Sequence, residues 1–147
     1  MSIDTVGNWL RDYQVYDFAG KCSFEYKDEL DFTVEVSADQ SCLFLSATLL
    51  QLPQADNEPL LLRLLQLNYM GIGTQGTCLS IDNPGRNIVL WYSRPIRELD
   101  AERFGNLIGS FLDTAEAIVQ RIEQQTDHRD TSDSPPETFN PDRMIRI

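Results

Sequence analysis

The residue types that most often carry out chemistry are scarce in this sequence. His128 is the only histidine among 147 residues, and it lies in the polar segment near the C-terminus. A serine or cysteine nucleophile is usually activated by a histidine base, and multi-histidine metal sites need several imidazole ligands. The sequence therefore excludes Ser–His and Cys–His pairs and histidine-rich metal sites. We expect a protein that is not an enzyme and has no catalytic residue.

Two further motifs imitate ligand sites. Gly71, Gly73 and Gly76 match the dinucleotide pattern G-x-G-x-x-G, but they follow a predicted helix and precede a strand, which reverses the required order. The acidic turn from Asp28 to Asp31 lacks the ligand spacing of an EF-hand. We interpret the glycines as a helix C-terminus and turn, and the acids as a solvated loop. No cofactor and no metal are expected.

The three cysteines indicate the compartment. Cys22, Cys42 and Cys78 are odd in number, widely spaced and set among apolar or β-branched neighbours. This pattern favours reduced, buried thiols over a disulfide framework or a zinc site. Residues 1–10 also lack the basic and apolar regions of a secretion signal. We expect a cytoplasmic protein.

The charge balance restricts the partners. Twelve basic residues against 23 acidic ones give a formal net charge of −11. Such a field repels phosphate backbones and anionic lipid headgroups, so neither nucleic acid nor a membrane surface is an expected partner. An acidic surface suits a basic or polar protein partner instead.

Apolar residues at helical spacing open the chain. They predict a first amphipathic helix with Ser2 or Asp4 at its start and Gly20 beyond its end. Its stripe consists of Ile3, Val6, Leu10 and Tyr13. Trp9 lies outside that stripe, and two roles stay open for it: an aromatic at the edge of the core, or one that faces a ligand.

From residue 21 to residue 53 the apolar period becomes two, which predicts a meander of three antiparallel strands. The alternating residues are Phe24, Tyr26, Phe32, Val34, Val36, Leu43, Leu45, Ala47 and Leu49. The third strand is apolar on its other face as well, through Cys42, Phe44 and Leu50. We therefore expect this strand to be central and covered on both sides, or to lie under a partner.

A leucine-rich helix is predicted next, with Pro59 in its first turn. Its leucines cover most of the circumference, whereas a helix on one sheet needs an apolar stripe only slightly wider than about 100°. Two explanations stay open: the helix is buried inside its own domain, or it packs on its sheet on one side and on a second subunit on the other.

The remaining elements are a hairpin, a long helix and a tail. Alternation on both sides of Asp82-Asn83-Pro84-Gly85 predicts the hairpin, and Asp100 can cap the long helix. The helix stripe is Phe104, Leu107, Ile108, Phe111, Leu112, Ala115, Ile118, Val119 and Ile122. Residues 1–126 are thus expected to form one domain. Residues 127–147 are expected to be a flexible acidic and polar tail that ends in Met144, Ile145 and Ile147.

The order of these elements resembles the class I type III secretion chaperones of the Tir chaperone family. The fold predicted on this basis is α+β, with the order α-β-β-β-α-β-β-α, a twisted antiparallel sheet and flanking helices. The likeness spans residues 2 to about 125. It is carried by Leu61-Leu62-Arg63-Leu64-Leu65-Gln66-Leu67-Asn68-Tyr69 before the glycine turn, by Leu79-Ser80-Ile81 and Ile88-Val89-Leu90, and by Leu99-Asp100 before the long helix.

The resemblance implies a homodimer in the bacterial cytosol that binds the N-terminal region of a secreted effector. The effector would wrap around the dimer in extended form and stay soluble for secretion, without ATP or a cofactor. The ATPase of the export apparatus is a further implied partner. The alternative that stays open is a regulatory protein of the same fold that sequesters a partner of a transcription factor.

Two sets of contact residues are predicted from the excess of apolar surface. The dimer interface is expected on the leucine-rich helix, at Leu60, Leu61, Leu64, Leu65, Leu67 and Tyr69. Effector binding is expected on the first helix and the meander, at Trp9, Tyr13, Phe32, Val34, Leu43 and Leu45. Hot spots of protein interfaces concentrate in buried aromatic anchors, so Trp9 is expected to contribute most.

Overall fold

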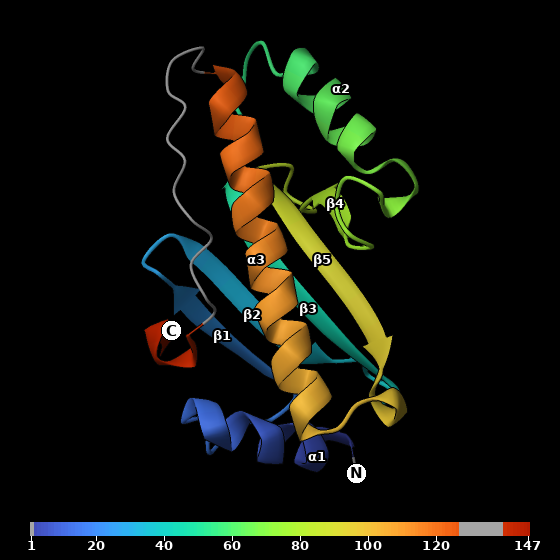
Figure 1. Ribbon diagram of the computed structural model, residues 1–147, viewed down its shortest axis with the longest axis vertical. Helices are drawn as coiled ribbons and strands as arrows, with labels where there is room; N and C mark the ends of the chain where they lie inside the picture. The colour runs from blue at the N-terminus through green and yellow to red at the C-terminus, as the bar shows by residue number, and fades with distance from the viewer. Residues whose placement is uncertain (1, 127–139) are drawn as a thin grey trace.

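A six-stranded antiparallel sheet forms the centre of the molecule in the computed structural model, which describes residues 2–126 and 140–147 (Figure 1). The strands are ordered β4-β5-β3-β2-β1-β6. Their bounds are β1 Lys21–Tyr26, β2 Leu30–Val36, β3 Cys42–Gln51, β4 Cys78–Ile81, β5 Asn87–Pro95 and β6 Met144–Arg146. The α+β class, the meander and the hairpin predicted from the sequence are confirmed, and β3 is central as expected.

The long helix α3 (Ala101–Thr126) crosses one face of the sheet, and α1 (Ser2–Leu10) lies at one end of it (Figure 1). Asp100 caps α3 as predicted, because its Oδ1 accepts a hydrogen bond from the backbone N–H of Arg103 at 2.8 Å. The predicted stripe of α3 is buried or half-buried along its whole length. None of the helices within the described ranges is long and apolar enough to cross a bilayer.

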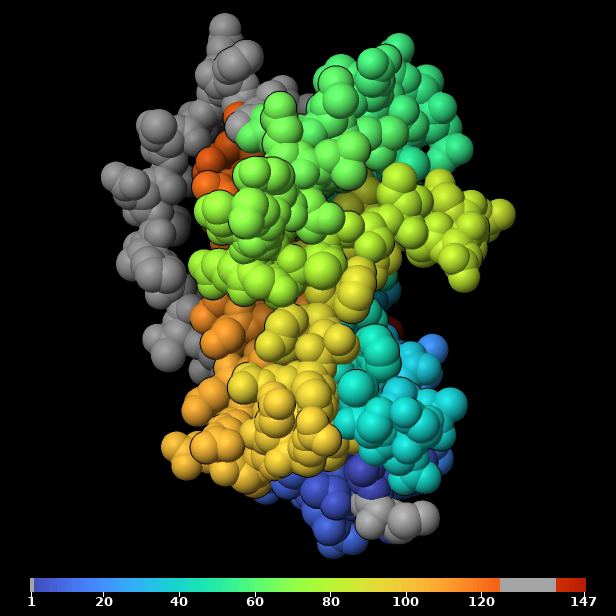
Figure 2. All heavy atoms as spheres, turned by 90° about the vertical axis from the view of Figure 1, so that its right-hand side faces the viewer, coloured from blue at the N-terminus to red at the C-terminus, as the bar shows by residue number. Residues whose placement is uncertain are grey.

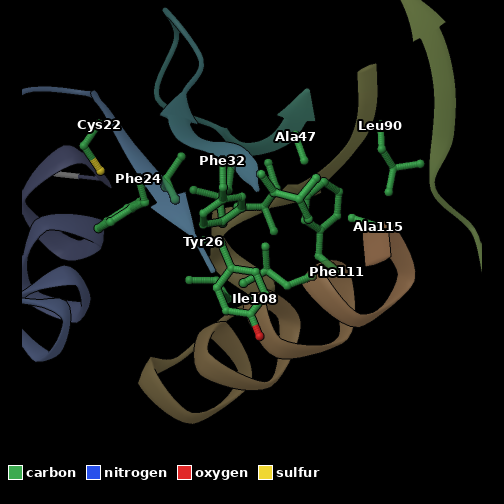
Figure 3. Packing of buried hydrophobic residues seen from close by; sticks show 14 of the residues in the cluster. Cys22, Phe24, Tyr26, Phe32, Ala47, Leu90, Ile108, Phe111 and Ala115 are labelled. Carbon is green, nitrogen blue, oxygen red and sulfur yellow. The ribbon is translucent and has the colours of Figure 1, made fainter. Parts of the chain in front are cut away.

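Aromatic rings from the meander pack against α3 to form the centre of the core (Figure 3). The ring of Phe32 lies 5.9 Å from that of Phe24 and 5.8 Å from that of Phe111, measured between centroids. Offset and tilted ring pairs at such distances are favourable. Cys22 is buried beside them, and burial raises the pKa of its thiol to about 11, so the group stays protonated at neutral pH. All three cysteines are free.

The structure corrects the expected C-terminal tail. Residues 140–147 form a short 3-10 helix (Pro141–Arg143) and β6, which pairs with β1. The expectation of a flexible tail does not hold for these residues, because the first edge of the meander offers free backbone groups that a short strand can bond. Residues 127–139 lie outside the described part of the chain.

Candidate partner-binding surfaces

Exposed apolar side chains gather on α2 (Glu58–Leu67) and the turn that follows it. Figure 2 shows this segment in green, standing at the surface at one end of the molecule. We call the following group the α2 patch, and each of its side chains is more than half exposed: Leu62, Leu65, Tyr69, Met70 and Ile72. A monomer rarely exposes so many large apolar neighbours without a partner for them.

Polar contacts fix the position of this segment against the sheet. Asn68, at the end of α2, accepts a hydrogen bond from the backbone N–H of Leu79 at 2.9 Å and donates one to the carbonyl of Leu79 at 3.3 Å. Thr74 and Thr77 each donate a hydroxyl to the other's carbonyl at 2.6 Å. The end of α2 and the glycine turn are therefore tied to β4, and the α2 patch is presented on a fixed support.

The glycine turn is a tight connection, as predicted. Gly71 has a φ of +69°, which favours glycine. A Cβ on Gly73 would lie 2.7 Å from the carbonyl oxygen of Leu67, so the two segments could not approach as closely with any other residue. The turn ends a helix and has no helix N-terminus that could hold a phosphate.

An open hollow of about 660 Å³ lies beside the patch, between α2, the turn and the last part of α3. Two arginines line it in an otherwise acidic protein: Arg63 from α2 and Arg121 from α3. The Nε atom of Arg63 is buried and has no hydrogen-bond acceptor among the described residues. Arg63 and Arg121 together bring positive charge to the hollow.

The predicted dimer residues divide into three groups. Leu64 is buried against the domain, whereas Leu65 and Tyr69 belong to the α2 patch. The others are half-buried: Leu60, Leu61 and Leu67. In the single chain α2 is thus not buried all round, which leaves its outer side available, and the dimer stays a prediction. Leu62 is not among the predicted residues, although its spacing of three and seven residues from Leu65 and Tyr69 places it on the same helix face.

Four of the predicted effector-binding residues are core residues in the structure. Their side chains are almost completely buried beneath α3: Phe32, Val34, Leu43 and Leu45. This corrects the expectation that they offer apolar surface to a partner. Strand alternation identifies a buried face, but in a half-covered sheet that face belongs to the domain's own helix.

The other two predicted residues lie at the rim between α1 and α3. The rings of Trp9 and Tyr13 lie 5.3 Å and 6.1 Å from the ring of Phe104, so both are half-buried edge aromatics. Burial raises the pKa of the Tyr13 hydroxyl. Tyr16, three residues after Tyr13, is largely exposed. The contact of Trp9 and Tyr13 with an effector stays a prediction.

The sheet face opposite α3 carries a second set of accessible apolar side chains. On β3 and β5 these are Cys42, Phe44, Val89 and Trp91, all half-buried or exposed. Leu50 is not among them, because a register shift after Thr48 pairs it with the buried Ile88 and it packs against the core. Trp91 is held by a hydrogen bond from its Nε1–H to the hydroxyl of Ser80 at 2.8 Å. The sequence expectation that β3 has a second apolar face holds for Cys42 and Phe44 and is wrong for Leu50. We call this surface the open sheet face.

The structure thus presents apolar and polar surfaces, on α2, at the rim of α1 and on the open sheet face, that a protein partner could cover. The described residues contain no group of three side chains that could hold a metal ion. Residues 12–118 match the model of the Tir chaperone protein (CesT) family, and the chain belongs to that family. The class of protein predicted from the sequence, a type III secretion chaperone, is confirmed.

Solved structures share the fold at low sequence identity. The crystal structure of the ExsC-ExsE complex matches with a TM-score of 0.69 and 17% identity, covering 82% of this chain and 95% of that one. The HopA1-SchA chaperone-effector complex gives a TM-score of 0.62 and 16% identity, with coverage of 80% and 91%. The ExoU-SpcU complex of the type III secretion system of Pseudomonas aeruginosa gives 0.60 and 17%, with coverage of 80% and 93%. No curated protein sequence matches the chain.

Proposed function

We propose that this protein is a cytoplasmic homodimer that binds the N-terminal region of a secreted effector and keeps it soluble and competent for secretion without ATP. The observation that carries the proposal is the family match over residues 12–118, because the family consists of Tir chaperones. Two of the similar folds come from a chaperone-effector complex and from a complex of the type III secretion system, which supports the same role.

The α2 patch supports the homodimer. Burying a leucine, isoleucine or methionine side chain contributes roughly 1.5–3 kcal/mol, and the patch holds four of these and a tyrosine. A twofold axis beside α2 would let the patch cover its own copy. From residue 58 to residue 81 the only charged residues are Glu58 and Arg63, so this segment has no net charge. Contact through it keeps the repulsion between two chains of net charge −11 low.

The effector surfaces we propose are the rim with Trp9 and Tyr13 and the open sheet face with Phe44 and Trp91. An extended segment can follow such separated apolar sites, with backbone bonds giving affinity and apolar pockets giving register. The net charge of −11 favours a segment with basic residues. The ATPase of the export apparatus is a further proposed partner.

Co-expression tests the proposal. The full chain is produced with each effector candidate encoded beside it, and the complex is sized by light scattering and trimmed by limited proteolysis. We expect two copies of the chain and one protected N-terminal effector fragment. If instead the chain binds no effector and captures only a regulator of transcription, the alternative of a same-fold regulatory protein replaces the proposal.

A further inference from the structure

The β1 edge of the sheet is occupied by the chain's own last residues. β6 pairs antiparallel with β1 in the register Tyr26 with Met144, Glu25 with Ile145 and Phe24 with Arg146. The N–H of Ile147 extends the ladder by donating to the carbonyl of Ser23 at 3.0 Å. Figure 1 shows this C-terminal segment in red beside β1, at the opposite side of the sheet from β4.

β6 makes few contacts with the rest of the domain. It pairs with three residues of β1, whereas β2 pairs with six. Ile145 and Ile147 are both more than half exposed, and only Met144 packs on the core. The guanidinium of Arg146 forms an ion pair with Asp17, but both side chains are substantially exposed, and exposed pairs contribute little.

The same edge presents negative charge that β6 does not match. Glu25 lies directly opposite Asp31 in the β1 and β2 pairing, and like charges in that position repel. On its other side Glu25 faces Ile145, an apolar side chain. A basic residue in the place of Ile145 would lie beside Glu25 and add an opposite-charge pair across the ladder. Asp17 already accepts a cation from position 146.

We propose that β6 is an internal competitor for the β1 edge: it occupies this edge in the free chain and must be displaced before an extended strand of the partner protein can pair there. The matching strand has an apolar residue at the place of Met144 and basic residues at the places of Ile145 and Arg146. This rests on the proposed function, since the strand would belong to the effector. β6 then acts as an internal competitor that rejects strands lacking the two basic residues.

Peptide binding to the full chain tests this. The probe is a fluorescent peptide with the sequence of residues 140–147, and a second peptide carries the change Ile145→Lys. Binding of each peptide to the wild type and to two release variants is measured by fluorescence anisotropy. Arg146→Glu releases β6 by placing a carboxylate beside Asp17, and Ile145→Pro releases it by placing a proline in the hydrogen-bonded ladder. Arg97→Glu, which makes the same charge change at an exposed residue of the 3-10 helix after β5, is the control.

If β6 fills the edge in about nine of ten molecules, its release raises the apparent affinity for peptide about tenfold. We expect this rise in both release variants and no rise in Arg97→Glu. The lysine peptide is expected to bind more tightly than the parent peptide, and hydrogen exchange is expected to slow in β1. Equal affinity for the wild type and the release variants, or protection at α2 in place of β1, would overturn the proposal.

An effector fragment separates this proposal from the proposed function. If the fragment binds and the peptide of residues 140–147 competes with it, both stand. If the fragment binds wild type and Arg146→Glu equally and the peptide does not compete, the chaperone role stands and the β1 docking site is wrong. If the peptide binds β1 but no effector fragment binds, the docking site stands and the effector role is wrong.

Discussion

Lys27, in the turn between β1 and β2, forms an ion pair with Glu116 in the middle of α3, with Nζ 3.0 Å from Oε1 and 3.1 Å from Oε2. The two side chains are only 17% and 26% exposed. Nearby, burial and the charge of Glu116 raise the pKa of the Asp113 carboxyl. One cation therefore offsets two carboxylates where the meander meets the helix.

The first prediction is that Lys27→Met lowers the free energy of unfolding by about 2 kcal/mol, because it leaves Glu116 partly buried without its cation. Lys21→Met is the matched control. Its pair with Glu35 is longer, at 4.0 Å, and exposed, so we expect a change of at most about 0.5 kcal/mol. Urea unfolding measures both, and equal losses would show that the Lys27 pair has no special role.

The second prediction separates the two sides of α2. Leu65→Asp is expected to give a folded monomer. Leu65 is 68% exposed in the single chain, so the substitution removes only its proposed contact with the partner subunit. Leu64→Asp places a carboxylate in a site that is 6% exposed, and it is expected to cost several kcal/mol of stability. Sedimentation and thermal melting measure the two effects. A wild type that sediments as a monomer at micromolar concentration would contradict the dimer.

The periodic elements were predictable because each has a long apolar pattern. The stripe of α3 and the alternation of the meander agree with the structure. The role of Phe32 or Leu45 was not predictable in the same way, because alternation does not say whether a helix or a partner covers the apolar face. β6 was missed because three residues are too few to show a period, and its pairing depends on an edge far away in sequence.

The third prediction concerns β6. Deletion of residues 140–147 is expected to lower stability by only about 1 kcal/mol, since it removes a few backbone hydrogen bonds, one exposed ion pair and one partly buried methionine. For a chain of this size that corresponds to a shift of roughly 2–4 °C in Tm. Calorimetry measures it. A loss beyond about 10 °C would mean that β6 is an integral strand and is not displaced by a partner.

The fourth prediction is a pH dependence at the turn between β2 and β3. Hydrogen bonds from Ser37 and Ser41 lower the pKa of Asp39 from 3.8 to about 2. Because the folded pKa is depressed, the stabilisation by Asp39 is fully present above pH about 4 and is lost as the pH falls toward 2. The difference in unfolding free energy between wild type and Asp39→Asn should shrink over that interval. A constant difference from pH 5 to pH 2 would contradict this origin.

The last prediction is that Trp9→Ala weakens binding of an effector N-terminal fragment by about 2 kcal/mol, roughly thirtyfold. Trp9 is half-buried against Phe104 at the rim of α1 and α3, so it combines a rigid position with surface that a partner can cover. Trp91→Ala, on the open sheet face, makes the same change elsewhere and shows whether that face contributes as well. Calorimetric titration of each folded variant measures the affinities. Phe32→Ala is expected to unfold the domain instead, since Phe32 is fully buried among the rings of the core. An affinity of Trp9→Ala equal to that of the wild type would remove α1 from the binding surface.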